Sequence, residues 1–411
     1  MFVSRIIFCK KEDESVMKLL VYKWTAFTLE DVCKALEEEG IDFKTISIPY
    51  NPRILEEQCA FKETLERILE KEPCDAFFSI NFFDCIAEVC HEKDIMYIAW
   101  TYDSPALGGK VRNFYYPTNR IFLFDSAEVA KHKKNGISNV YHLDLAVDVR
   151  KYNQFKISPM EQLKYGSEIS FVGQLYENLM QEVLGCLTPY TAAYLSALVD
   201  IQMRNYNVNL IEPLVNKRLI EFMDTPELRE KMRPFMEERG VRNGEIWKEP
   251  LVDMLMMRVT NRERILLLAL LSKFHQVKLF SGDRHQVLEN VIFGGVVDYH
   301  NTMPKVFKSS KVNLNITKRS IEKGIPLRCL DIMGCRSFLM SNYQEDFLGE
   351  MEDGKDMVMY YSIEDALEKA DFYLKNSKAR EEIANRGYKK VKDCFNYHRQ
   401  LGKIWEITGL K

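Results

Sequence analysis

Residues 317–334 combine cations, a glycine and a helix start in an order that suits an anion. A predicted strand over 311–316 ends in a loop that carries Arg319 and Lys323, and Gly324 precedes a proline at which a helix begins. The first turn of a helix presents free N–H groups and a partial positive charge, and nearby cations strengthen its attraction for negative charge. The pattern predicts a diphosphate site at this loop and helix start.

Arg328 and Asp331 lie in the first turns of the same predicted helix. The Arg328 guanidinium could bind the same diphosphate, and the Asp331 carboxylate could accept hydrogen bonds from ribose hydroxyls. Their spacing of three residues suits a plain ion pair on the helix surface equally well. The sequence leaves both interpretations open.

Two further residues lie at the ends of predicted strands. Gly173 ends a strand over 168–173, where a glycine lets backbone N–H groups approach a phosphate but also serves an ordinary turn. Asp103 follows a strand over 95–100 and could accept a proton from a substrate hydroxyl. Because a serine and a proline follow Asp103, a purely structural turn is the alternative.

Motifs of several other enzyme classes are missing from the sequence. It contains no GxGxxG after a strand, no GxxxxGK[ST], no HExxH and no GxSxG, which disfavours dehydrogenases, P-loop NTPases, zincins and serine hydrolases. It also contains no DxD, the acidic pair with which metal-dependent sugar transferases hold a divalent cation. We therefore expect no metal at the site and no resident cofactor.

The elements that must position these residues alternate between strand and helix in both halves of the chain. In a buried parallel sheet, short apolar strands are joined by amphipathic helices that cover both faces. The strands expected in the first half are 19–22, 43–48, 76–80, 95–100, 120–124 and 140–143. Those expected in the second half are 168–173, 277–281, 311–316, 337–341 and 357–360. The pattern predicts an α/β chain with two doubly wound parallel-sheet domains.

The same alternation of strands and helices predicts the domain boundaries. An extension over 1–16 precedes an N-terminal domain over 17–155 and a C-terminal domain over 156–395, and a last helix over 396–411 can return to the first domain. The second domain is interrupted by a helical insertion at about 174–273, whose size suits acceptor recognition or an oligomer contact. Since α/β sheets bind ligands beyond the carboxyl ends of their strands, the cleft between the domains is the expected site.

The amino-acid composition limits the kinds of partner that the protein is expected to bind. Of 411 residues, 57 are Lys or Arg and 60 are Asp or Glu, so no basic excess attracts nucleic acid. The longest apolar run, 265–271, is far short of the roughly 20 residues that a membrane span needs. Ten cysteines are scattered without a CxxC pair, which is typical of reduced thiols in a cytoplasmic protein. The apolar stretch within 1–16 is too short for a signal peptide.

Several short motifs together resemble the GT-B glycosyltransferases. In the second half these are FSGD (280–283), VDY (297–299), MPKVF (303–307), SKVNLNI (310–316) and GIPLRCLDIMG (324–334). In the first half they are WTYDSP (100–105), IFLFD (121–125) and LDLAVD (143–148). Order and spacing are similar to those of the CgeB-type spore-maturation glycosyltransferase-like proteins, over roughly residues 17–405.

The resemblance implies two Rossmann-like domains that face a cleft, with a nucleotide-diphosphate-sugar donor, above all a UDP-sugar, on the C-terminal domain. It places Asp331 at the donor ribose, Tyr299 near the base, and Arg319, Lys323 and Arg328 at the diphosphate. The acceptor, a glycan, a protein or a small molecule, would face the N-terminal domain. A metal is usually not needed in this family.

The sequence departs from the pattern of this family at one pair of residues, which limits the mechanism that can be transferred to it. Retaining GT-B enzymes often have two glutamates separated by seven residues, but the residue eight before Asp331 is Lys323, and Glu322 is one position out of register. The retaining mechanism is therefore not transferred. Two other functions remain open on the same fold: a sugar-nucleotide epimerase, which needs no acceptor, and a binding or structural protein without turnover. A homo-oligomer is a further alternative.

Overall fold

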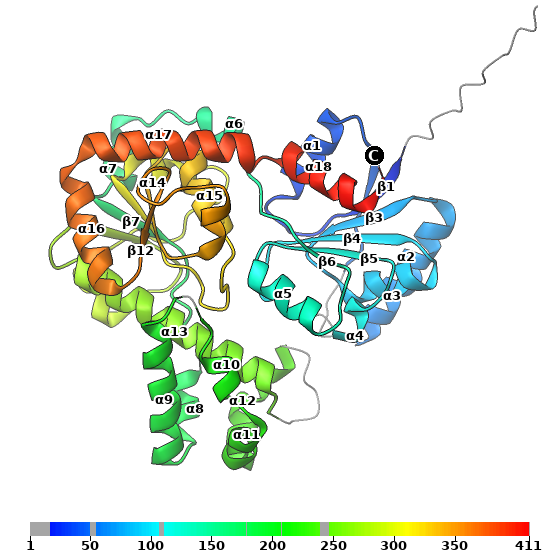
Figure 1. Ribbon diagram of the computed structural model, residues 1–411, viewed down its shortest axis with the longest axis horizontal. Helices are drawn as coiled ribbons and strands as arrows, with labels where there is room; N and C mark the ends of the chain where they lie inside the picture. Colours follow the sequence, from blue (N-terminus) through cyan, green and yellow to red (C-terminus); the bar gives the residue numbers. More distant parts are fainter. Residues whose placement is uncertain are drawn as a thin grey trace, which may run out of the picture.

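Two α/β domains lie side by side, and a helical projection extends from one of them (Figure 1). The computed structural model describes residues 17–49, 55–106, 111–177, 179–206, 208–238 and 246–410. The expected extension over 1–16 lies outside the described residues. Among those described, the strands form two six-stranded sheets in which every pairing is parallel. The predicted α/β fold class with two parallel-sheet domains is confirmed.

The N-terminal sheet has the strand order β2-β1-β3-β4-β5-β6. Its strands are β1 (Lys18–Tyr22), β2 (Asp42–Ile46), β3 (Ala76–Ile80), β4 (Met96–Thr101), β5 (Asn119–Leu123) and β6 (Val140–His142). The helices between them are α1 (Leu29–Glu38), α2 (Leu55–Lys71), α3 (Asp84–Glu92), α4 (Val111–Phe114) and α5 (Ser126–Lys134). The central strand β3 is buried along its whole length, as expected for a strand with helices on both faces.

The second sheet has the strand order β12-β11-β10-β7-β8-β9. Its strands are β7 (Ile169–Val172), β8 (Val277–Phe280), β9 (Ile292–Phe293), β10 (Val312–Asn315), β11 (Leu339–Asn342) and β12 (Val358–Tyr360). Helices α14 (Met303–Ser309), α15 (Leu327–Gly334), α16 (Ile363–Lys375) and α17 (Ser377–Cys394) pack around them, with 3₁₀ turns η1 (Gln286–Leu288) and η2 (Glu345–Gly349). The short edge strand β9 was not predicted, because two exposed residues carry no burial pattern.

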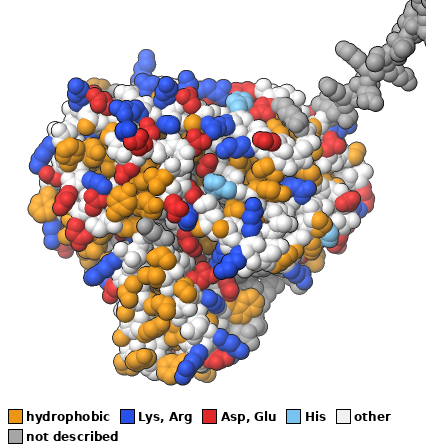
Figure 2. Space-filling model, viewed as in Figure 1, with side chains coloured by type: hydrophobic (Ala, Val, Ile, Leu, Met, Phe, Trp, Pro, Cys, Tyr) orange, Lys and Arg blue, Asp and Glu red, His pale blue; other side chains and the backbone are white. Residues whose placement is uncertain are grey.

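Between β7 and β8 the chain forms a helical projection, drawn in green in Figure 1. It consists of α8 (Met180–Gly185), α9 (Pro189–Met203), α10 (Ile211–Leu214), α11 (Lys217–Met223), α12 (Pro226–Glu238) and α13 (Lys248–Leu271). The projection has its own apolar core, and α13 carries that core into the C-terminal domain: Leu255 packs in the projection, whereas Leu268 packs beneath the sheet. Hydrophobic side chains also appear on its surface (Figure 2).

The chain passes twice between the domains. On the way out it forms α6 (Val149–Asn153) and α7 (Pro159–Tyr165), and on the way back α18 (Tyr397–Thr408) follows α17. Helix α18 packs on α1 with an apolar face that includes Leu401, Ile404 and Trp405. The Trp405 indole N–H donates to Glu39 across 3.0 Å. The last helix is therefore part of the N-terminal domain. Among the described residues, no helix is long and apolar enough to cross a membrane.

Candidate functional site

The two domains meet through side chains at the carboxyl ends of their strands. Phe27, in the loop after β1, stacks on Tyr299, in the loop before α14, with 5.2 Å between ring centroids. The Lys151 ammonium, from the connection between the domains, lies 5.7 Å from the Tyr299 ring centroid. These contacts bring the loop that was expected beside a nucleotide base against the first loop of the N-terminal domain.

Asp103 follows β4 at this boundary. Asn81, directly after β3, donates from Nδ2 to Asp103 Oδ2 across 2.6 Å, and its Oδ1 accepts from the Asp103 backbone N–H across 3.3 Å. The Asp103 side chain is exposed, yet loss of water around it raises the pKa of its carboxyl above the ordinary value, and the charge of Lys318 opposes that rise. A carboxylate of this kind can accept a proton.

Lys318 belongs to the C-terminal domain and begins the cationic loop that follows β10. Its Nζ lies 3.3 Å from Asp253 Oδ1 of α13, and its side chain is largely buried. The charge of Lys318 also lowers the pKa of the Asp103 carboxyl, so a cation of one domain lies near a carboxyl group of the other. The sequence analysis named neighbouring residues of this loop and missed Lys318, although Lys318 is the first cation after the strand end.

Asp331 is almost completely buried in α15. Its Oδ1 accepts hydrogen bonds from the hydroxyls of Tyr152, across 2.7 Å, and Tyr299, across 2.9 Å. Its Oδ2 is buried without a hydrogen-bond partner, and an Arg328 guanidinium nitrogen lies 3.7 Å from it. Burial raises the pKa of the Asp331 carboxyl, while Arg328 and the tyrosine hydroxyls act in the opposite direction. A buried carboxylate oxygen without a hydrogen-bond partner fits a hydroxyl-bearing ligand.

Arg328 lies beside Asp331 Oδ2, whereas the Tyr299 hydroxyl donates to the other oxygen of the same carboxylate. Arg328 contacts Met303 and lies over the Phe307 ring at 5.8 Å, so its guanidinium is only partly exposed. The ion pair expected as one alternative for Arg328 and Asp331 is therefore present. Because Asp331 Oδ2 is buried, a ribose contact there requires the side chains around it to move, and it stays a prediction.

Arg319 has a different environment from the one expected. Its side chain is 5 % exposed, and its Nε donates to Glu263 Oε2 of α13 across 2.7 Å. The guanidinium also donates to the backbone oxygens of Met203 and Asn205 and stacks over Tyr206. A guanidinium with this many internal partners ties the loop to the helical projection, and direct contact with a diphosphate stays an untested prediction.

Lys323 and Gly324 also have partners that sequence patterns do not reveal. The Lys323 ammonium pairs with Glu345 across 2.9 Å, and its backbone N–H donates to Asp125 of the other domain across 3.1 Å. A Cβ at Gly324 would lie 2.8 Å from the Asp125 Cα, so only glycine allows this approach. Gly324 is therefore required by the packing of the two domains, and its expected part in the diphosphate site stays a prediction.

Gly173 lies one residue beyond β7, and its N–H donates to Phe280 O across 3.0 Å. The Gly173 N–H is therefore already used within the sheet. This fits the alternative that Gly173 serves an ordinary turn at the strand end better than it fits phosphate binding. The start of α15 differs, because Pro326 at its N-cap offers no side-chain cap. Its first N–H groups are the better anion donors of the two.

No metal-binding cluster is found in the part of the chain that the structure describes: no three His, Cys, Asp or Glu side chains are placed to hold an ion. The nine described cysteines form no disulfide. The expectations of a metal-free reaction and of a cytoplasmic location are not tested by these observations.

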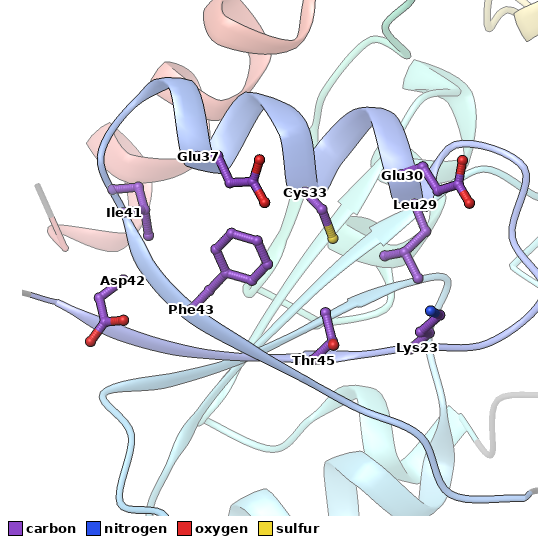
Figure 3. Close-up of a pocket in the computed structure, with 9 residues that line it drawn as sticks. All are labelled: Lys23, Leu29, Glu30, Cys33, Glu37, Ile41, Asp42, Phe43 and Thr45. Carbon is purple, nitrogen blue, oxygen red and sulfur yellow. The ribbon is translucent and has the colours of Figure 1, made fainter.

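A groove of about 530 Å³ opens on the N-terminal domain, between α1 and the edge strand β2 (Figure 3). Phe43 and Cys33 point into it, and Glu37 and Glu30 lie along its helical wall. Lys23, at the end of β1, closes the end nearest the loop that carries Phe27.

Solved structures share this two-domain arrangement. HepE from Anabaena, in complex with UDP and glucose, aligns with a TM-score of 0.50 at 11% identity, over 96% of this chain and 99% of that one. Sucrose-phosphate synthase from Thermosynechococcus elongatus aligns with a TM-score of 0.57 at 9% identity, and OtsA in its apo form with 0.55 at 8%, each over 96% of this chain and 99% of the other. The chain has the GT-B fold.

The sequence of the C-terminal domain also resembles that of glycosyltransferases. Residues 262–406 match the family model described as "Glycosyl transferase-like". A search of curated proteins gives no significant match. The matched segment contains Lys318, Arg328 and Asp331, so the loop and helix of the candidate site belong to the glycosyltransferase-like part of this GT-B chain. The narrower CgeB-type resemblance stays an expectation.

Proposed function

We propose that the protein is a glycosyltransferase that moves a sugar from a nucleotide-diphosphate-sugar donor to a hydroxyl-bearing acceptor without a metal ion. The observation that carries the proposal is that Asp103 lies near enough to Lys318, of the other domain, for this cation to lower the pKa of its carboxyl, beside a loop and helix of a glycosyltransferase-like segment. Opposed charges in a GT-B interdomain cleft match the two charges that develop during sugar transfer.

The chemistry assigns one role to each domain. Asp103 accepts the proton of the acceptor hydroxyl as the acceptor oxygen bonds to the anomeric carbon. The bond from that carbon to the diphosphate oxygen breaks, and the diphosphate leaves with the electron pair. Lys318 and the first N–H groups of α15 stabilise the negative charge of the leaving group, which is the task a metal performs elsewhere.

The nucleoside end of the donor is assigned to Asp331, Tyr299 and Arg328. Asp331 Oδ2, which is buried without a hydrogen-bond partner, is the acceptor intended for a ribose hydroxyl once the side chains around it have moved aside. A UDP-sugar is our choice of donor, with support from the UDP and glucose in the HepE structure, which has the same fold. The acceptor is assigned to the N-terminal domain.

Calorimetric titration with UDP, GDP, dTDP, CDP and ADP tests the donor half of the proposal. We expect one nucleotide to bind selectively and equally well in EDTA and in Mg²⁺. Lys318→Met should weaken binding, or slow donor turnover, by roughly 10- to 100-fold, the scale of losing a charge-assisted contact. Lys311→Met is the matched control, since Lys311 precedes the same strand at its amino end and pairs with Glu168 there. If the folded protein bound none of these nucleotides, the proposal would be wrong.

The two other functions give different products. Donor incubated alone yields an isomerised sugar nucleotide if the protein is an epimerase. A binding protein yields selective nucleotide affinity with no donor hydrolysis at high enzyme concentration. Slow release of free sugar from the donor, accelerated by an acceptor mixture, supports transfer.

A further inference from the structure

Asn81 holds an unusual backbone conformation at the candidate site. It follows β3 with φ at +65°, in the left-handed region that non-glycine residues seldom adopt. Asparagine tolerates this region better than most residues, yet the conformation persists only where the surroundings hold it. Here the Asn81 N–H donates to Trp100 O across 2.9 Å, and its C=O accepts from the Ser79 hydroxyl across 2.6 Å.

The support beneath Asn81 is buried and rigid. Ser79 Oγ also shares a hydrogen bond with the Tyr97 hydroxyl, 2.7 Å away, and both side chains are completely buried. Asn81 therefore cannot rotate away without breaking contacts inside the domain core.

The Asn81 side chain, held in this way, forms hydrogen bonds with the segment that carries Asp103. Its Oδ1 accepts from the backbone N–H groups of Tyr102, across 2.8 Å, and Asp103, across 3.3 Å. Its Nδ2 donates to Asp103 Oδ2 across 2.6 Å. Among the described residues, Asp103 Oδ1 has no hydrogen-bond partner, so the one engaged oxygen determines where the other points.

We propose that Asn81 is the positioning residue of the site, which orients Asp103 so that Oδ1 faces the acceptor hydroxyl. The assignment rests on the proposed function, because Asp103 acts there as the base. The Nδ2–H donor also stabilises the ionised form of the carboxylate, so Asn81 sets the protonation of Asp103 as well as its direction. The charged group of the opposite domain that lowers the pKa of Asp103 is Lys318, itself paired with Asp253.

Two substitutions separate these effects. Asn81→Gly removes the side chain while it keeps a residue at ease with a positive φ, and kcat should fall by about 10- to 100-fold with donor KM unchanged. Asn81→Asp keeps the shape and the Oδ1 acceptor, but places a carboxylate oxygen against Asp103 Oδ2. It should move the acid limb of the kcat/KM profile to higher pH by about one unit or more. Asn376→Asp, the same change at the exposed end of α16, is the control.

A titration of Asp103 by carboxyl ¹³C NMR gives a readout that does not depend on turnover. In the Asn81→Asp protein the Asp103 titration should shift upward, whereas a role confined to the turn would lower the melting temperature and leave that titration in place. If Asp103→Asn abolishes turnover and Asn81→Asp moves neither the acid limb nor the titration, the inference is overturned. If Asp103→Asn retains full turnover, the base assignment of the proposed function fails instead, whatever Asn81 does.

Discussion

Asp103 and Asp125 occupy equivalent places in the N-terminal sheet and have opposite surroundings. Each lies two residues beyond the end of its strand, β4 for Asp103 and β5 for Asp125, and these strands are neighbours. Asp103 is exposed and bonded to Asn81 of its own domain. Asp125 is 1 % exposed and accepts from the backbone N–H groups of Glu322 and Lys323 in the other domain, across 2.7 and 3.1 Å.

The difference shows that a strand-end carboxylate takes its role from its partners. A partner in the same domain leaves Asp103 exposed. Partners in the other domain turn Asp125 into a contact that holds the two domains together. Ser126 extends this contact, since its N–H and hydroxyl both donate to Asp346, across 3.0 and 2.5 Å.

The largest effect is expected at the exposed carboxylate. Asp103→Asn keeps the size of the side chain but removes the proton acceptor, so kcat should fall by about 10²- to 10⁴-fold. In the wild type, because loss of water around the side chain raises the pKa of Asp103, the rate should fall as the pH drops through that raised pKa. Initial rates across pH measure both effects. Loss of nucleotide binding in the same variant would mean that Asp103 acts on the donor and not as a base.

Asp125→Ala should mainly affect stability and domain contact. It leaves two amide N–H groups without an acceptor and removes the cap that Ala127 N–H uses at the start of α5. The expected cost is about 2–5 kcal/mol. A lower melting temperature and a larger radius of gyration in solution scattering are the measurements. An unchanged radius of gyration would show that the remaining interdomain contacts suffice.

The stability of the folded protein should depend on the protonation of Asp125. Burial raises the pKa of Asp125 to about 6, so the folded state binds its proton more tightly than the unfolded state does. The ionised carboxylate therefore costs stability above pH 6, and that cost is relieved as the pH falls from about 6 toward 4, by about 2–3 kcal/mol. As the pH falls through this range, the melting temperature of the wild type should rise relative to that of Asp125→Asn. Parallel curves for the two proteins would contradict it.

The smallest effect is expected in the groove of Figure 3. Phe43→Ala trims one half-buried wall and should cost about 1 kcal/mol or less. Since β1 and β3 separate β2 from β4, Phe43 lies on the order of 14 Å across the sheet from the strand that positions Asp103. Donor affinity and donor hydrolysis should therefore be unchanged. A tenfold loss of either would tie the groove to the donor site.

Much of the fold follows from local sequence. Runs such as Ala76–Ile80 are short and mostly apolar, which predicts buried parallel strands, and α1 repeats its apolar residues at helical spacing. The order of strands and helices then restricts the topology to doubly wound sheets. The loop from Thr317 and the helix with Asp331 were found the same way, because strand ends and helix starts have local signals.

Partner choice was decided only by the tertiary structure. Nothing near Arg319 in the sequence indicates that Glu263, 56 residues away, would bury it, or that Gly324 would be needed against Asp125. Asn81 and Lys318 were missed because neither residue type is unusual after a strand. Periodicity and strand ends depend on neighbours along the chain, so the sequence determined the elements and the edge of each sheet where the chemistry lies. Hydrogen bonds and ion pairs join residues that are distant in sequence, so only the folded chain could decide which charges remain facing the cleft.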